Sequence, residues 1–95
     1  MKTAVISFTA AGGKLNDLIS GILLADSYKD AKNIYALTGK LMKEYDALIF
    51  IGAAGIAVRA IAPYIKSKDT DPAVIVCDEM GKFVIPVLSG HIGGS

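Results

Sequence analysis

The sequence has little of several residue types that build specialised sites. It contains one cysteine, one histidine and no tryptophan in 95 residues. A single thiol excludes an internal disulfide, and no Cys or His spacing around Cys77 predicts a metal site. Cys77 lies in an apolar run, so we expect a buried, inert thiol.

Long apolar segments are also missing. No apolar run approaches the ~20 residues that cross a bilayer. The apolar part of the N-terminus is too short for the core of a signal peptide, and Gly13 and Lys14 follow soon after it. We therefore expect a cytoplasmic protein that has no membrane partner.

The net charge is small as well. Ten Lys and Arg residues oppose nine Asp and Glu residues, for a net charge of +1, and the basic residues are scattered. This balance argues against nucleic acid as the main partner. The chain is nevertheless 53% hydrophobic with a mean hydropathy of +0.49, which is more than a small monomer easily hides. We expect self-association, as a homo-oligomer, or a missing partner segment.

The first half of the chain alternates between strand and helix patterns. A short buried strand is predicted over residues 4–8, followed by a turn of small residues and an amphipathic helix. The predicted apolar face of that helix comprises Leu15, Leu18, Ile19, Ile22 and Leu23. A short strand around Ser27 and Tyr28 and a second amphipathic helix over residues 34–45 complete this half.

The second half predicts a central strand and a hairpin. Residues 46–51 form a continuous apolar run that is typical of a strand covered on both faces. A helix over residues 56–62 is expected to be buried on several sides and to stop or kink before Pro63. Residues 73–77 and 83–88 predict an antiparallel pair, with Gly81 at positive φ in the turn and Pro86 on an edge strand.

Together these elements predict one α/β domain over residues 1–95. Its architecture is a three-layer αβα sandwich with a small mixed, mostly parallel sheet and a C-terminal β-hairpin.

Two glycine-rich turns follow predicted strands and are the first candidates for a binding site. Ligands of open α/β sheets bind outside the carboxyl ends of the strands, so we expect both turns to line one crevice. In the first turn, backbone N–H groups could hold a carboxylate or phosphate, with Arg59 as charge partner. The candidate binding residues there are Gly52, Ala53, Gly55 and Ile56. Tight packing of strand against helix explains the glycines equally well.

The second turn contains the histidine. His91 has an unperturbed pKa of ~6.5 and is the first candidate for a general acid or base. Small or polar neighbours leave it accessible: Ser89, Gly90, Gly93 and Gly94. Glu79, at the predicted hairpin tip, is a second catalytic candidate, although an acidic residue there is usually ordinary turn chemistry. Neither turn matches a dinucleotide fingerprint or a P-loop, which leaves a nucleotide-binding domain without support.

Three segments resemble a known family in their residue sequence and in their order along the chain. They are residues 45–63 (YDALIFIGAAGIAVRAIAP), 68–76 (KDTDPAVIV) and 88–94 (LSGHIGG). They are similar to the N-terminal region of the cobalamin biosynthesis CbiG family, the cobalt-precorrin-5A hydrolases. The first 44 residues agree with that family only in their layout. Family members continue into a further helix and usually a second domain, so the resemblance implies a chain truncated at its C-terminal edge.

The resemblance implies a hydrolase of the anaerobic route to vitamin B12. The family opens the δ-lactone of cobalt-precorrin-5A and releases acetaldehyde, giving cobalt-precorrin-5B. Such a reaction needs a base and donors for a developing oxyanion. Cobalt enters with the substrate, so no separate cofactor and no protein-bound metal are implied. The alternative is a non-catalytic corrinoid-binding or docking module whose chemistry lies outside this chain.

Overall fold

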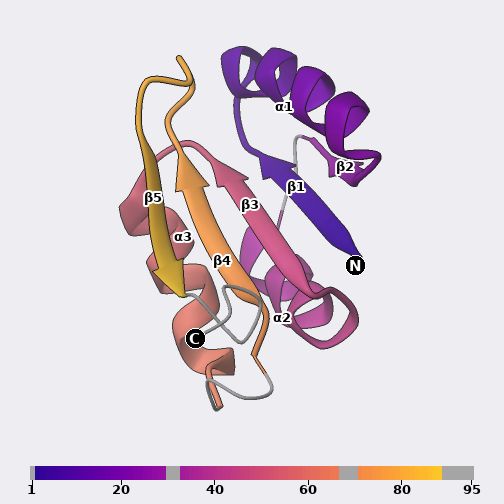
Figure 1. Ribbon diagram of the computed structural model, residues 1–95. Helices are drawn as coiled ribbons and strands as arrows, with labels where there is room; N and C mark the ends of the chain where they lie inside the picture. The colour runs from indigo at the N-terminus through magenta and orange to yellow at the C-terminus, as the bar shows by residue number, and fades with distance from the viewer. Residues whose placement is uncertain (1, 30–32, 67–70, 89–95) are drawn as a thin grey trace.

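The computed structural model describes residues 2–29, 33–66 and 71–88, and Figure 1 shows the arrangement of their helices and strands. In chain order these are β1 (Thr3–Ser7), α1 (Ala10–Leu23), β2 (Asp26–Tyr28), α2 (Ile34–Glu44), β3 (Ala47–Ile51), α3 (Ala54–Ile61), the 3-10 turn η1 (Ala62–Tyr64), β4 (Ala73–Cys77) and β5 (Val84–Leu88). The predicted alternation of strand and helix is confirmed.

The five strands form one mixed sheet in the order β2-β1-β3-β4-β5, with β3 in the middle. All pairs are parallel except β4 with β5, which form the antiparallel hairpin (Figure 1). Gly81 has a φ of 72° in the hairpin turn, and Pro86 lies on the edge strand β5, where a missing N–H donor is tolerated. These predictions are confirmed.

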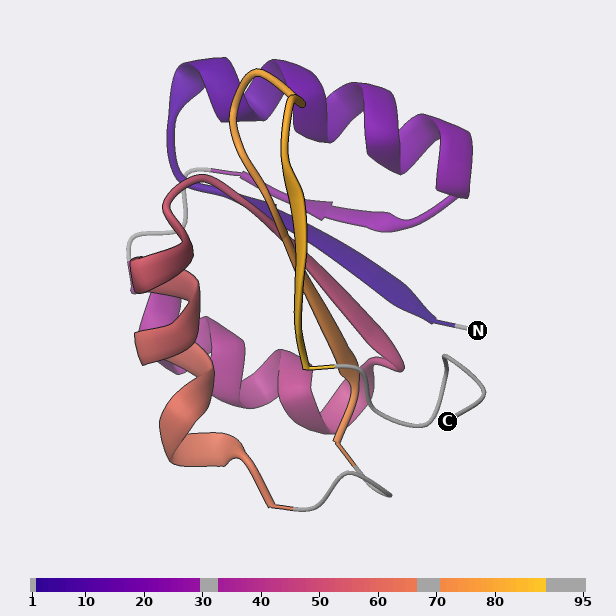
Figure 2. The same cartoon turned by 60° about the vertical axis from the view of Figure 1, so that its left-hand side comes forward.

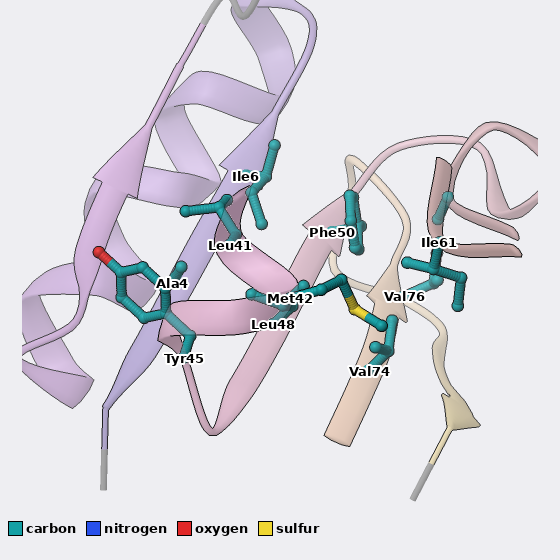
Figure 3. Packing of buried hydrophobic residues seen from close by; sticks show 11 residues of the cluster. Ala4, Ile6, Leu41, Met42, Tyr45, Leu48, Phe50, Ile61, Val74 and Val76 are labelled. Atoms are coloured by element: carbon teal, nitrogen blue, oxygen red, sulfur yellow. The ribbon is translucent and has the colours of Figure 1, made fainter. Parts of the chain in front are cut away.

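The helices cover the sheet unequally. Helix α1 lies on one face and α2 and α3 lie on the other, which gives the predicted three layers (Figure 2). The larger core lies on the face of α2 and α3, where Phe50, Leu48 and Ile6 have no exposed surface. Figure 3 shows these side chains pointing toward Leu41 and Met42 of α2. On the opposite face the buried apolar cluster is small and consists of Val5, Ile51 and Cys77.

Helix α1 meets the sheet through small and polar residues. Its buried residues are Gly12, Asn16 and Ser20, which recur every four positions on one side of the helix. The predicted apolar face is therefore correct only at its margin, because Leu15 and Ile19 pack beside this stripe whereas three other members are exposed. The exposed members are Leu18, Ile22 and Leu23. Small side chains let the helix approach the strands closely, and these three exposed side chains face solvent.

Asn16 joins three elements through its side chain. Its amide nitrogen donates to the carbonyls of Val5 and Tyr28 and to the Ser7 hydroxyl, at 3.1 to 3.2 Å. Its amide oxygen accepts hydrogen bonds from the hydroxyls of Ser20 and Ser27, at 2.7 and 2.8 Å. The side chain is fully buried and satisfied, so it fixes α1 against β1 and β2.

Helix α3 differs from its prediction in two respects. It begins at Ala54, so Gly55 belongs to its first turn. Only Ala57, Ala60 and Ile61 are buried, which corrects the expectation of a helix buried on several sides. One face packs against the sheet and α2, and the other faces solvent. Pro63 follows in η1, so the predicted break near residue 62 is confirmed.

Candidate functional site at the carboxyl edge of the sheet

The three central parallel strands end at one edge of the sheet, beside the starts of α1 and α3 (Figure 1). The strand ends Ser7, Ile51 and Cys77 are aligned across β1, β3 and β4. The residues that follow them are Phe8–Thr9, Gly52–Ala53 and Asp78–Glu79. This is the edge at which the sequence predicted a ligand crevice.

Gly52 is required by the backbone. Its φ is +144°, and a Cβ there would lie 2.8 Å from the Phe8 ring. Its N–H donates to the Cys77 carbonyl at 2.9 Å, which holds the end of β3 against the end of β4. The packing explanation therefore accounts for Gly52.

Gly55 has no packing reason of this kind. A Cβ at that position would meet no atom within 4 Å. Ala53 is the N-cap of α3 and makes no side-chain capping hydrogen bond, and Ala53, Gly55 and Ile56 are all exposed. The backbone at the start of α3 is open to a ligand, which leaves the predicted binding role of these residues as a prediction.

Glu79 is held at this edge by a residue that sequence reasoning missed. The Thr9 hydroxyl donates to Oε2 of Glu79 at 2.6 Å and accepts the Gly12 N–H at 3.0 Å. Thr9 is the N-cap of α1, and a threonine before a helical pattern is a sequence signal for that role. One carboxylate oxygen of Glu79 is thereby fixed over the start of α1.

The same carboxylate borders a groove between α1 and the hairpin. The groove has a volume of about 420 Å³ and is lined by Ala11, Lys14, Leu15, Leu18, Glu79 and Met80. Its walls are mostly aliphatic, with one ammonium group and one carboxylate. Glu79 thus combines a fixed orientation with access to a hollow that a ligand can enter.

Asp78 has a structural role in the hairpin loop. Its Oδ1 accepts the Phe83 N–H at 2.8 Å, and its carbonyl accepts the Gly81 N–H at 2.9 Å. The hydrogen bond from the Phe83 backbone lowers the pKa of Asp78. These bonds shape the loop that presents Glu79.

Arg59 makes no ion pair with the Glu79 carboxylate. It is exposed on α3 and makes no ion pair with any residue that the structure describes. It lies five residues after Ala54, or about 7 Å along the helix axis. Its predicted role as a charge partner remains a prediction.

The second glycine turn, with Ser89, Gly90, His91, Gly93 and Gly94, lies outside the described residues. Its starting point is nevertheless defined, because Leu88 ends β5 and pairs with Val74 near the beginning of β4. Gly52 follows Ile51, which pairs with Cys77 at the end of β4. The antiparallel direction of β5 therefore puts Leu88 at the edge opposite Gly52, and the expectation that both turns line one crevice remains a prediction.

Comparison with known proteins agrees with this fold. Residues 36–95 match the family described as cobalamin synthesis G N-terminal. The chain belongs to the CbiG N-terminal family.

Named relatives extend this CbiG assignment. The chain is 63% identical over 51 residues to cobalt-precorrin-5A hydrolase of Salmonella typhimurium, which is 54% of this chain and 14% of that protein. It is 51% identical over 63 residues to the Priestia megaterium protein of the same name, or 66% of this chain and 17% of that protein. The chain thus spans less than a fifth of the length of these two relatives.

A solved structure covers almost the whole CbiG N-terminal chain. A cobalamin biosynthesis protein G homolog from Sulfolobus solfataricus matches 97% of this chain and 30% of its own, with 31% identity and a TM-score of 0.81. The similarity therefore includes the first 44 residues, where the sequence alone suggested only a shared layout.

Among the residues that the structure describes, no group of three or more His, Cys, Asp and Glu side chains is placed to bind a metal ion. None of the helices in that part of the chain has the length and apolar character needed to cross a membrane. Cys77 is buried, and its burial raises the pKa of the thiol, in keeping with the prediction of an inert side chain.

Proposed function

We propose that this chain is the N-terminal portion of a cobalt-precorrin-5A hydrolase and contributes to substrate binding and lactone opening. The observation that carries the proposal is the 63% identity over 51 residues to a protein of that name. In this proposal the substrate brings its own cobalt, so the chain needs no resident metal. The reaction would take place in the cytoplasm.

Glu79 is the described residue best suited to act as a base. Water that adds to a lactone carbonyl must lose a proton, and a carboxylate beside a groove can accept it. Thr9 holds Oε2 and leaves Oε1 without a hydrogen bond among the described residues. The open backbone at the start of α3 supplies donors for a carboxylate or a developing oxyanion. His91 remains the other candidate base on sequence grounds.

A chimeric enzyme tests this proposal directly. The chain replaces the matching segment of the Salmonella typhimurium hydrolase, and acetaldehyde release from cobalt-precorrin-5A is followed with alcohol dehydrogenase. We expect the chimera to turn over, and Glu79→Gln or His91→Ala to lower kcat at least a hundredfold where that residue is the base. A folded chimera without turnover would contradict the proposal.

The docking-module alternative is favoured by one observation. Among the described residues at the carboxyl edge, Glu79 is the only exposed or half-buried carboxylate that does not shape the hairpin loop. One of its two oxygens already accepts a hydrogen bond from Thr9. A chain that only binds corrinoid would tolerate loss of both candidate bases. Near-normal turnover in the double variant Glu79→Gln, His91→Ala would select this alternative.

A further inference from the structure

We propose that a groove between α2 and η1, at the opposite edge of the sheet from Glu79, binds carboxylate side chains of the tetrapyrrole substrate. This inference rests on the proposed function for the identity of the ligand. The groove itself is defined by shape, by an aromatic wall and by positive charge. None of its residues was a candidate in the sequence.

Two adjoining hollows make up the groove. One has a volume of about 260 Å³ and the other about 570 Å³, and they share Gly39, Lys43 and Tyr64. The remaining lining residues are Ala36, Lys40, Met42, Glu44, Lys66 and Asp71. The groove therefore runs along the exposed side of α2 toward the segment that precedes β4.

Tyr64 forms a fixed wall of this groove. Its hydroxyl donates to the Tyr35 carbonyl at 3.3 Å, and its ring lies directly against α2 at Gly39. A Cβ at Gly39 would lie 2.6 Å from the ring, so glycine is needed for this contact. An aromatic face held in this way offers a surface on which a flat macrocycle can pack.

The charge around the wall is mainly positive. Lys40 and Lys43 lie one turn apart on α2, and Lys66 approaches from beyond η1. The one ion pair within the described ranges, Lys29 with Asp17, lies elsewhere, so these three ammonium groups have no carboxylate partner there.

The two acidic groups of the groove offset this charge unequally. Asp71 is 4% exposed, and its Oδ2 accepts the Lys66 N–H at 2.7 Å, so that carboxylate is engaged with the protein. Glu44 is exposed at the end of α2. Among the lining residues that the structure describes, three exposed cations therefore stand against one exposed acid.

Several separated cations around a flat wall match a ring that carries several acidic side chains. A single small anion would need converging donors, whereas these lysines come from α2 and from the segment after η1. Lysine binds carboxylates as a flexible point charge, which suits side chains projecting from a macrocycle. Together with the proposed function, this makes the ligand class a polycarboxylated tetrapyrrole.

Binding measurements on the 95-residue chain test the site. The probes are cobalt-precorrin-5A, uroporphyrin, which carries carboxylates on every pyrrole, and a porphyrin with uncharged hydroxyl groups. Binding is followed by the absorbance of the macrocycle. Lys43→Gln and Lys66→Gln each remove one exposed charge, Lys82→Gln is the matched control in the hairpin loop, and Lys14→Gln reports on binding in the groove beside Glu79.

We expect Lys43→Gln and Lys66→Gln each to weaken binding of both acidic probes about three- to fivefold, in the upper range for an exposed charge pair, and Lys82→Gln to change nothing. Binding should also weaken with salt, and the uncharged porphyrin should not distinguish the variants. Circular dichroism confirms that each variant is folded.

The outcomes separate the two proposals. Weakening by Lys14→Gln with no effect of Lys43→Gln or Lys66→Gln places the ligand in the α1 groove, which overturns this inference and leaves the proposed function intact. Groove-dependent binding of uroporphyrin without binding of cobalt-precorrin-5A supports the site and contradicts the proposed substrate. If neither acidic probe binds, the inference is overturned.

Discussion

Replacing Asn16 should destabilise the domain more than any exposed substitution on α1. Asn16→Ala leaves the buried hydroxyls of Ser7 and Ser20 without their partner. A buried polar group left unpaired costs about 1 to 3 kcal/mol, so two such groups predict a loss of about 2 to 6 kcal/mol. A domain of this length has a total of roughly 5 to 14 kcal/mol, which makes the loss close to limiting.

Urea denaturation followed by circular dichroism measures this loss. The matched control is Asp17→Ala, the neighbouring residue, whose exposed ion pair with Lys29 should contribute at most about 0.5 kcal/mol. An unchanged m-value would show that the variants share the same two-state transition. If Asn16→Ala and Asp17→Ala lost similar free energy, the buried network would not be what holds α1.

Asn16→Asp separates the donor half of the amide from the acceptor half. The carboxylate keeps the hydroxyl donors Ser20 and Ser27 but faces the carbonyls of Val5 and Tyr28. Burial among carbonyls favours the protonated acid, so the folded-state pKa of the new carboxyl lies above the unfolded value of about 3.9. The folded state then binds more protons, and the stability of the variant should rise as the pH falls from 7 toward 4. A flat pH profile would refute this account.

Four further predictions concern other parts of the chain. Gly39→Ala should cost about 1 to 3 kcal/mol, measured by urea denaturation, because its Cβ would meet the Tyr64 ring at 2.6 Å. Leu24→Gly should stabilise the domain by about 1 kcal/mol in the same assay, since Leu24 is 92% exposed and has a φ of 54° at the end of α1. Cys77, whose thiol pKa is raised by burial, should react with a thiol reagent at pH 8 far more slowly in the folded protein than in urea. Sedimentation velocity should show self-association as the concentration rises, because Leu18 and Phe83 are 60% and 66% exposed, and a well-folded monomer at high concentration would contradict that.

The strands were the most predictable part of the fold. Residues 46–51 form an apolar run that is typical of a strand covered on both faces, and β3 is the central strand with α1 on one side and α2 and α3 on the other. Gly81 and Pro86 predicted the hairpin and its edge position, because positive φ and a missing N–H donor have few places in a sheet. In each case a local physical requirement of the residue decides the structure.

The buried face of α1 was less predictable, because hydrophobic periodicity and burial disagree there. Leu18 and Ile22 belong to the apolar pattern and are exposed, whereas Asn16 is polar and fully buried. Hydrophobic periodicity takes account only of the hydropathy of each side chain and does not indicate how close the helix lies to the sheet. The spacing of Gly12, Asn16 and Ser20 is visible in the sequence as a stripe of small and polar residues. Whether that stripe is buried depends on hydrogen-bond partners in β1 and β2.

The candidate site shows the same limit at the level of topology. The two glycine turns predicted a shared crevice, and the same part of the sequence predicted an antiparallel hairpin. The hairpin places Gly52 and Leu88 at opposite edges of the sheet. Thr9, Glu79 and the start of α3 lie at the edge of Gly52, and the lysines around Tyr64 lie at the other. Because Glu79 and the lysines around Tyr64 lie at opposite edges of the sheet, one corrinoid reaches both only if it spans the length of the strands, and otherwise two molecules bind. The binding stoichiometry of uroporphyrin therefore distinguishes one continuous site from two.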